Sequence, residues 1–141
     1  MQIRNLMTDQ VTTLDSNSTV VDAAKVMRDL NVGVVPVCEG QQPVGMITDR
    51  DITIRNVAEN KDFNTPVNQV MSQDPVYGSP EMSVEEAAQL MGDRQIRRLP
   101  IVENNNIVGI VSLGDLAVAD QTDIEAGEAL STISEPSQPQ Q

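Results

Sequence analysis

The chain carries the same pattern of residues twice, and this internal duplication limits the possible folds more than any other feature. The segment Gly45–Asp51 recurs as Gly109–Asp115, a shift of 64 residues. With no gap between Met7 and Leu116, the same shift pairs Met7 with Met71, Val20 with Val84, Ala23-Ala24 with Ala87-Ala88, Met27 with Met91, Asp29 with Asp93, Pro36 with Pro100 and Val44 with Val108. Because the repeated segment ends in a hydroxyl and a carboxylate, it suggests two related binding sites rather than one active site.

The size of the repeats predicts one pseudo-symmetric domain. The repeats span residues 3–60 and 67–119, and each is too small to bury enough surface alone. The 39% hydrophobic content is sufficient for a shared core of aliphatic side chains. Phe63 and Tyr77 are the only aromatic residues, so ring stacking is not expected to be a main means of recognition.

The charge excludes several classes of partner. A net charge of −12 argues against nucleic acid and anionic membranes, whose binding depends on Lys and Arg. Every basic residue lies at or before Arg98, and residues 120–141 form an acidic tail that we expect to be partly disordered, with a possible docking helix over 124–133. The single Cys38, the polar start of the chain and the lack of a long apolar run predict a soluble cytoplasmic protein.

Each repeat predicts the order strand, helix, strand, turn, strand, helix. In the first, a short strand over 11–13 precedes a helix capped by Thr19 with Asp22, and strands over 34–37 and 44–48 precede a helix over 49–58. The apolar face of the first helix should hold Val20, Ala23, Ala24, Met27 and Leu30.

The second repeat follows the same order. Ser83 with Glu86 caps a helix whose buried face is Val84, Ala87, Ala88 and Met91, and strands over 99–102 and 107–111 flank a turn at 103–106. Strands joined through a helix should be parallel, and those joined by a tight turn antiparallel. The fold class is therefore α/β or α+β: a small mixed sheet with helices on one face, made twice.

The motif Gly-apolar-apolar-Thr/Ser-x-x-Asp, which follows a Pro-containing apolar strand in both repeats, resembles a tandem pair of cystathionine-β-synthase (CBS) domains, or Bateman module. The likeness covers residues 3–119 and is greatest to short stand-alone CBS-pair proteins of bacilli and related bacteria. The resemblance implies two clefts for adenosine-type ligands, in which the Asp binds ribose hydroxyls and the Thr or Ser lies near the first phosphate. It also implies a regulatory protein that forms a homodimer.

The resemblance assigns the residues of two clefts, each completed by the opposite repeat. The first cleft would consist of Met46, Thr48, Arg50, Asp51, Pro75, Val76, Ile96, Arg97 and Arg98. The second would consist of Asp9, Val11, Val32, Gly33, Val34, Ile110, Ser112 and Asp115. Because Arg97-Arg98 aligns with Gly33-Val34, and Arg50 with Gly114, we expect only the first cleft to suit phosphate.

Simpler structural roles remain open for the same residues. Asp51 and Asp115 could be acids at helix starts, with Thr48 and Ser112 as N-caps. Arg97-Arg98 could be a solvated pair, while Arg55 and Arg94 are expected at the surface. Cys38 and the Met27 and Met91 positions are expected to pack as hydrophobic residues, and Tyr77 to pack rather than line a cleft.

Catalysis and resident cofactors are not expected. The chain has no His to serve as a base, no glycine-rich phosphate loop and no clustered metal ligands. Two functions remain. One is a sensor of an adenine nucleotide (AMP, ADP or ATP) or a related adenosyl ligand that transmits occupancy to an effector protein. The alternative is a ligand-independent dimerisation or interaction scaffold.

Overall fold

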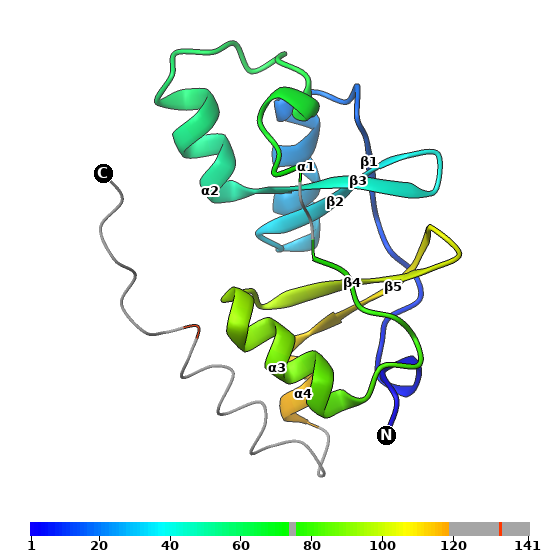
Figure 1. The fold of residues 1–141 in the computed structure, drawn as a ribbon. Coiled ribbons are helices and arrows are strands. Elements are labelled where there is room, and N and C mark those ends of the chain that lie inside the picture. Colours follow the sequence, from blue (N-terminus) through cyan, green and yellow to red (C-terminus); the bar gives the residue numbers. More distant parts are fainter. Residues whose placement is uncertain (74–75, 119–132, 134–141) are drawn as a thin grey trace. The chain divides into compact units, whose positions relative to one another are not determined.

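A computed structural model of the protein describes residues 1–73, 76–118 and 133. Its elements in chain order are η1 (Ile3–Asn5), β1 (Leu14–Asp15), α1 (Val20–Leu30), β2 (Val34–Glu39), β3 (Gln42–Thr48), α2 (Asp49–Asp51), η2 (Ile52–Val57), η3 (Val67–Gln69), α3 (Val84–Arg94), β4 (Arg98–Glu103), β5 (Asn106–Ser112) and α4 (Leu113–Ala117). This α+β content confirms the predicted fold class (Figure 1).

The chain divides into two compact units. The first-repeat unit consists of residues 11–76 and 104–107. The second-repeat unit consists of residues 1–10, 77–103 and the described chain from 108. The units thus cut the chain differently from the sequence repeats 3–60 and 67–119, because residues 1–10 fold with the second repeat.

The first-repeat unit contains a three-stranded sheet in the order β1-β2-β3. β1 pairs with β2 in parallel through Leu14 and Val37, and β2 pairs with β3 antiparallel, as the connections predict. The predicted strand at 11–13 is misplaced, since β1 is Leu14–Asp15: Leu14 is the buried apolar residue of this segment and so takes the position beside β2. Its counterpart Gly78 forms an isolated parallel bridge to Ile101 in the second-repeat unit.

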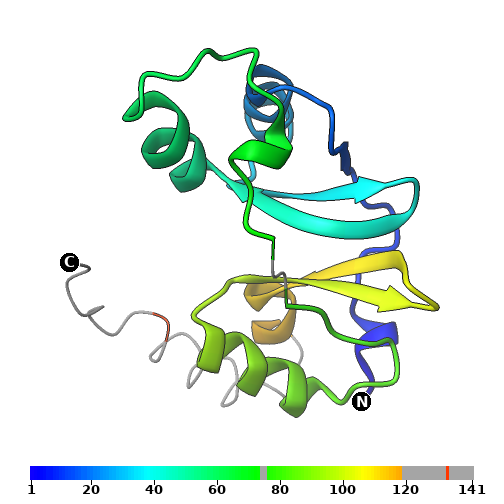
Figure 2. The same ribbon diagram turned by 45° about the horizontal axis from the view of Figure 1, so that its top comes forward.

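The hairpin β4-β5 (Figure 2) turns at two asparagines, Asn104 and Asn105, which both have positive φ. Two successive residues of positive φ characterise the type I′ turn, whose twist matches that of paired strands. The turn between β2 and β3 instead has Gly40 at φ +64°. At the turns, each of these four strands extends one or two residues beyond its predicted end.

Both long helices begin at the predicted capping boxes. In α1 the Asp22 amide donates to the Thr19 hydroxyl at 3.2 Å, and the Thr19 amide donates to the Asp22 carboxylate at 3.0 Å. Hydrogen bonding of the Asp22 carboxylate to the Thr19 amide, and secondarily to the Thr19 side chain, lowers the pKa of Asp22. In α3 the Glu86 amide donates to the Ser83 hydroxyl at 3.1 Å. Each helix ends at a left-handed residue, Asn31 in α1 and Gln95 in α3.

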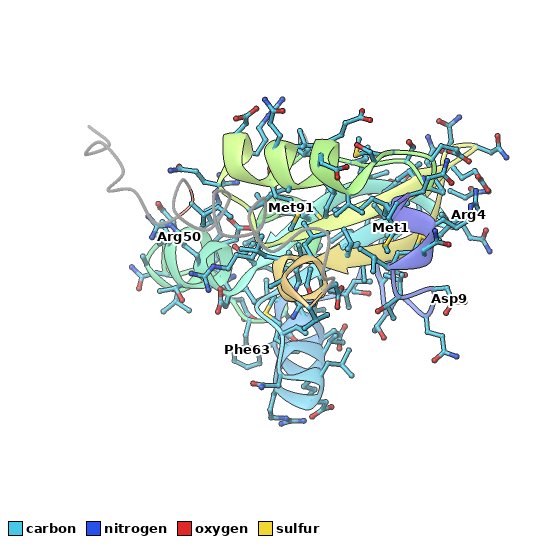
Figure 3. All side chains as sticks on the ribbon, turned by 90° about the horizontal axis from the view of Figure 1, so that it is seen from below. Met1, Arg4, Asp9, Arg50, Phe63 and Met91 are labelled. Atoms are coloured by element: carbon cyan, nitrogen blue, oxygen red, sulfur yellow. The ribbon has the colours of Figure 1, made fainter. Side chains whose placement is uncertain are left out.

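The buried face of α3 agrees with the prediction, since Val84, Ala87, Ala88 and Met91 are all buried. Figure 3 labels Met91 beneath this helix. That of α1 agrees only in part. Val20, Ala23 and Met27 are buried, but Ala24 and Leu30 are exposed, so their predicted places on the apolar face are wrong. The reason is local, because α3 packs against α4, whose Leu113 and Leu116 are buried, whereas the corresponding positions in the first repeat are the exposed Asp49 and the half-buried Ile52.

Each unit is completed by the segment at the start of the other repeat. In the first-repeat unit, Val67 donates to the Ser18 carbonyl at 2.7 Å and Val20 to the Thr65 carbonyl at 2.9 Å. Shifted by 64 residues, the same bonds run from Ile3 to Met82 and from Val84 to Met1 in the second-repeat unit. Ile3 and Val67 are fully buried. Residues 1–10 therefore complete the core beside the second repeat in the same way as residues 65–73 complete the core beside the first.

Candidate functional site

The motif Thr48–Asp51 joins the end of β3 to the start of α2 and forms a complete capping box. The Asp51 amide donates to the Thr48 hydroxyl at 3.0 Å, and the Thr48 amide donates to Oδ2 of Asp51 at 2.9 Å. The Asp51 side chain is 15% exposed. The N-cap interpretation is therefore confirmed, yet it uses only one oxygen of the carboxylate and leaves Oδ1 for another partner.

The second copy of the motif has the same geometry at the junction of β5 and α4. The Asp115 amide donates to the Ser112 hydroxyl at 3.1 Å, and the Ser112 amide donates to Oδ2 of Asp115 at 2.8 Å. Within the described part of the chain, Oδ1 of Asp115 has no hydrogen-bond or ion-pair partner, whereas Oδ1 of Asp51 faces Arg55.

The glycine that opens each motif lies where another segment crosses closely. A Cβ at Gly45 would stand 2.6 Å from the Ser72 carbonyl oxygen and 2.5 Å from the Met71 sulfur. A Cβ at Gly109 would meet Thr8 and Met7 in the same way, at 3.0 Å and 2.6 Å. Only glycine permits this approach without displacement, so the first position of the motif is structural.

These crossings carry two of the predicted cleft segments to the motifs. The next residue of β3, Met46, exchanges backbone hydrogen bonds with Ser72, which lies shortly before Val76. In the second-repeat unit, Ile110 exchanges the same bonds with Thr8, the neighbour of Asp9. Val76, Met46 and Ile110 are half-buried and Asp9 is exposed, while the predicted Pro75 lies outside the described residues.

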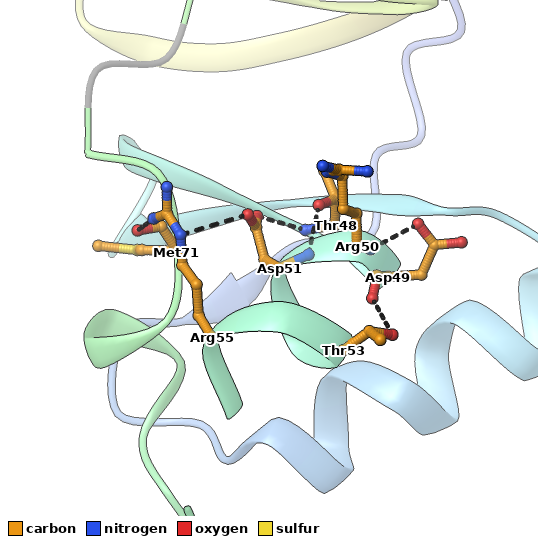
Figure 4. A network of polar contacts seen from close by, with 7 residues as sticks. All are labelled: Thr48, Asp49, Arg50, Asp51, Thr53, Arg55 and Met71. Carbon is orange, nitrogen blue, oxygen red and sulfur yellow. Dashed lines mark hydrogen bonds and ion pairs between the residues drawn. The ribbon is translucent and has the colours of Figure 1, made fainter. Parts of the chain in front are cut away.

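Arg55 is exposed, as expected, and it also belongs to the polar network around Asp51 (Figure 4). η2 continues α2 as a wider π-helical turn and carries Arg55 one turn beyond Asp51. Nε of Arg55 lies 3.9 Å from Oδ1 of Asp51, and Nη1 donates to the Met71 carbonyl at 3.4 Å. The i,i+4 spacing of Asp51 and Arg55 on a predicted helix was the sequence signal for this pair.

The turn before β2 or β4 hydrogen-bonds to the motif of its own repeat. The Asp49 amide donates to the Gly33 carbonyl at 3.0 Å, and the Leu113 amide to the Arg97 carbonyl at 2.9 Å. A Cβ at Gly33 would lie 3.2 Å from the Asp49 carboxylate, so that acid faces a glycine in the first repeat. The proposed completion of the Asp51 cleft by Ile96, Arg97 and Arg98, and of the Asp115 cleft by Val11, Val32, Gly33 and Val34, stays a prediction.

The basic residues assigned to the first cleft are available for a ligand. Arg50 and Arg97 are exposed and Arg98 is half-buried. Among the described residues none of the three forms an ion pair with an acidic side chain, in contrast to Arg4, which pairs with Glu81 and Glu103. The described acids therefore do not neutralise these arginines.

Neither a nucleophile nor a metal centre emerges from the described residues. Cys38 is buried in β2, and burial raises the pKa of its thiol, which fits the expected packing role. No group of three or more described His, Cys, Asp or Glu side chains could hold a metal ion. None of the described helices is long and apolar enough to cross a membrane.

Comparison with known proteins identifies the family. The chain matches the CBS domain family twice, over residues 3–55 and 67–121, and belongs to it. It is 52% identical over 132 residues to the CBS domain-containing protein YhcV of Bacillus subtilis, covering 94% of each chain. CBS-pair proteins are generally regulatory modules rather than enzymes.

Solved structures share the fold. The crystal structure of Hypoxic Response Protein I with two coordinated zinc ions is 31% identical, with a TM-score of 0.76 over 83% of this chain and 97% of that one. The CBS domain pair of protein MJ0100, in complex with 5′-methylthioadenosine and S-adenosyl-L-methionine, is 24% identical, with a TM-score of 0.74 over 83% of this chain and 97% of that one. At this identity the second likeness concerns the fold alone.

Proposed function

We propose that the protein is a cytoplasmic regulatory protein that binds an adenosine-type ligand at its Thr48–Asp51 and Ser112–Asp115 motifs and transmits occupancy to an effector. The observation that carries this proposal is that the two oxygens of each carboxylate have different surroundings. Oδ2 is held by the backbone of the capping box, which fixes the side chain, while Oδ1 is left to accept from a ligand hydroxyl. The adenosyl ligands bound by the CBS pair of MJ0100 support the same ligand class.

A ribose is the natural partner for such a group. A carboxylate oxygen accepts strongly from hydroxyls, and one charge-assisted hydrogen bond contributes about 1.5–3 kcal/mol. Because the capping box already holds the carboxylate in place, little side-chain entropy is lost on binding. A ligand can then shift the protein between two states by its difference in affinity for them.

The test is thermal unfolding with adenosine, AMP, ADP, ATP, 5′-methylthioadenosine and S-adenosyl-L-methionine. We expect at least one to raise the melting temperature, with a stabilisation of about 2.7 kcal/mol at one hundred times its Kd. Asp51→Asn keeps the shape and the cap acceptor but removes the charge, so it should weaken binding at the first motif. Asp115→Asn makes the same change in the other repeat and should weaken binding at the second motif. No stabilisation by any of these ligands at about millimolar concentration would refute the proposal.

The first cleft is proposed to be the one that accepts phosphate, because Arg97 and Arg98, which pair with no acid among the described residues, align with Gly33 and Val34. In the same assay, Arg97→Ala should weaken AMP more than adenosine, since only AMP offers a phosphate to a guanidinium. Equal losses for both ligands would contradict a phosphate role for Arg97.

A second candidate is an assembly scaffold in which the homodimer itself is the functional form. Ile54 and Val57 lie three residues apart in η2 and are 44% and 64% exposed, and Phe63 in the following loop is 64% exposed. Exposed apolar side chains that follow one another within ten residues of the chain are of the kind that often marks an interface. The hexameric assembly of a CBS-CP12 protein, 28% identical to this chain, supports self-association as a property of related proteins.

A further inference from the structure

Arg55 occupies a position that the family resemblance does not assign and that the second repeat does not reproduce. A shift of 64 residues pairs it with Ala119, which lies outside the described residues. The two motifs are otherwise matched in their capping boxes and their glycine crossings. The cation beside Asp51 is thus a difference between two sites that share the rest of their local geometry.

The guanidinium of Arg55 is only partly engaged. Its contact with Oδ1 of Asp51 at 3.9 Å is a long ion pair, and its bond to the Met71 carbonyl at 3.4 Å is at the outer limit for a hydrogen bond. The side chain is 55% exposed, and a guanidinium has five N–H donors. Within the described part of the chain, most of its donors therefore have no acceptor, while the guanidinium stays next to the carboxylate oxygen that the capping box does not use.

The pair also changes the charge of the first site. An isolated Asp51 repels an anionic group brought close to Oδ1, whereas a guanidinium 3.9 Å away offsets that repulsion and offers donors to the anion. On a nucleotide, the phosphate is joined to the same ribose whose hydroxyls would bind the carboxylate. A ligand that donates to Oδ1 of Asp51 thus brings its anionic group near Arg55.

We propose that Arg55 is a specificity-determining residue that gives the Asp51 site its preference for adenosine-type ligands bearing an anionic group on the ribose. This inference rests on the proposed function. It does not require Arg97 or Arg98, because Asp51, Arg55 and Met71 all belong to the first-repeat unit (Figure 4).

The test is isothermal titration calorimetry with adenosine and AMP on the full chain and three variants: Arg55→Ala, Arg55→Lys and Lys25→Ala. Lys25 is an exposed residue of α1 in the same unit, so its variant matches the change in net charge. Arg55→Ala should weaken AMP about five- to tenfold and adenosine less than about twofold, as expected for one cation near a protein surface. Arg55→Lys should retain most of the preference, and Lys25→Ala should resemble the wild type.

Each other outcome is decisive. Equal weakening of both ligands by Arg55→Ala would assign Arg55 only to orienting Asp51, and unchanged affinities would leave it a surface residue; either overturns the inference while the proposed function stands. A loss for Lys25→Ala equal to that for Arg55→Ala would reduce the effect to net charge and also overturn it. A wild type that binds neither adenosine nor AMP would overturn this inference, and the proposed function would fall with it only if no other ligand of the thermal unfolding panel stabilised the protein.

Discussion

Individual residues in the repeated motif have separate physical roles. Gly45 and Gly109 admit a crossing backbone, and Thr48 and Ser112 cap a helix. The aspartates complete the cap with Oδ2 and keep Oδ1 outside it. The structural and the ligand-binding interpretations of these aspartates are therefore compatible. One oxygen serves each role.

At this scale we predict that Gly45→Ala destabilises the protein. The new Cβ would meet the Ser72 carbonyl at 2.6 Å, and forcing the backbone apart should cost about 1–3 kcal/mol in the free energy of unfolding, measured by urea denaturation. Gly114→Ala is the control. Its Cβ would lie 3.6 Å from the Ser112 hydroxyl, an ordinary contact, and alanine favours the helix α4, so the stability of this variant should stay equal or rise. Similar losses for both variants would contradict the role of the close crossing.

Among the elements, the short helix η1 has a larger role than its length suggests. It lies at the start of the chain, yet it bonds to Met82 and Pro80 of the second-repeat unit and buries Ile3 completely. Its counterpart η3 buries Val67 in the first-repeat unit. Each unit is thus closed by a segment that the repeat pattern alone assigns to the other repeat.

We therefore predict that Ile3→Ala lowers the free energy of unfolding by about 2–5 kcal/mol, the range for truncating a fully buried aliphatic side chain. Asn5→Ala, an exposed change in the same helix, should have little effect. Hydrogen exchange would locate the damage, with faster exchange of the Thr8 and Ile110 amides that pair in this unit. An Ile3→Ala variant as stable as the wild type would show that η1 is dispensable.

For the whole molecule, the open question is whether assembly or ligand occupancy is the primary function. We expect sedimentation velocity to show a homodimer. Val57→Asp replaces an exposed apolar side chain of η2 by a charged one and should convert this homodimer to a monomer. Leu30→Asp, at an exposed apolar residue of α1, is the matched control and should leave the dimer intact. A wild type that sediments as a monomer, or a dimer that survives Val57→Asp, would argue against this surface.

The local features of the protein could be predicted from its sequence. The duplication, both capping boxes, the strand pairing and the family all follow from patterns a few residues long, because caps and amphipathic faces depend on near neighbours. The prediction failed where burial depends on packing against another element: Ala24 of α1 is exposed, whereas its counterpart Ala88 is buried in α3, which packs against α4.

Which segment completes each unit, and which charge lies beside Asp51, depends on the three-dimensional fold. Bonds such as that between Ile3 and Met82 join residues far apart in the chain, and no periodicity records them. In the sequence Arg55 has the features of an ordinary surface residue, but in the fold η2 places its Nε 3.9 Å from Oδ1 of Asp51. The duplication identified two similar carboxylates in the sequence, but their surroundings differ because contacts in space, unlike repeats, need not be the same in both copies.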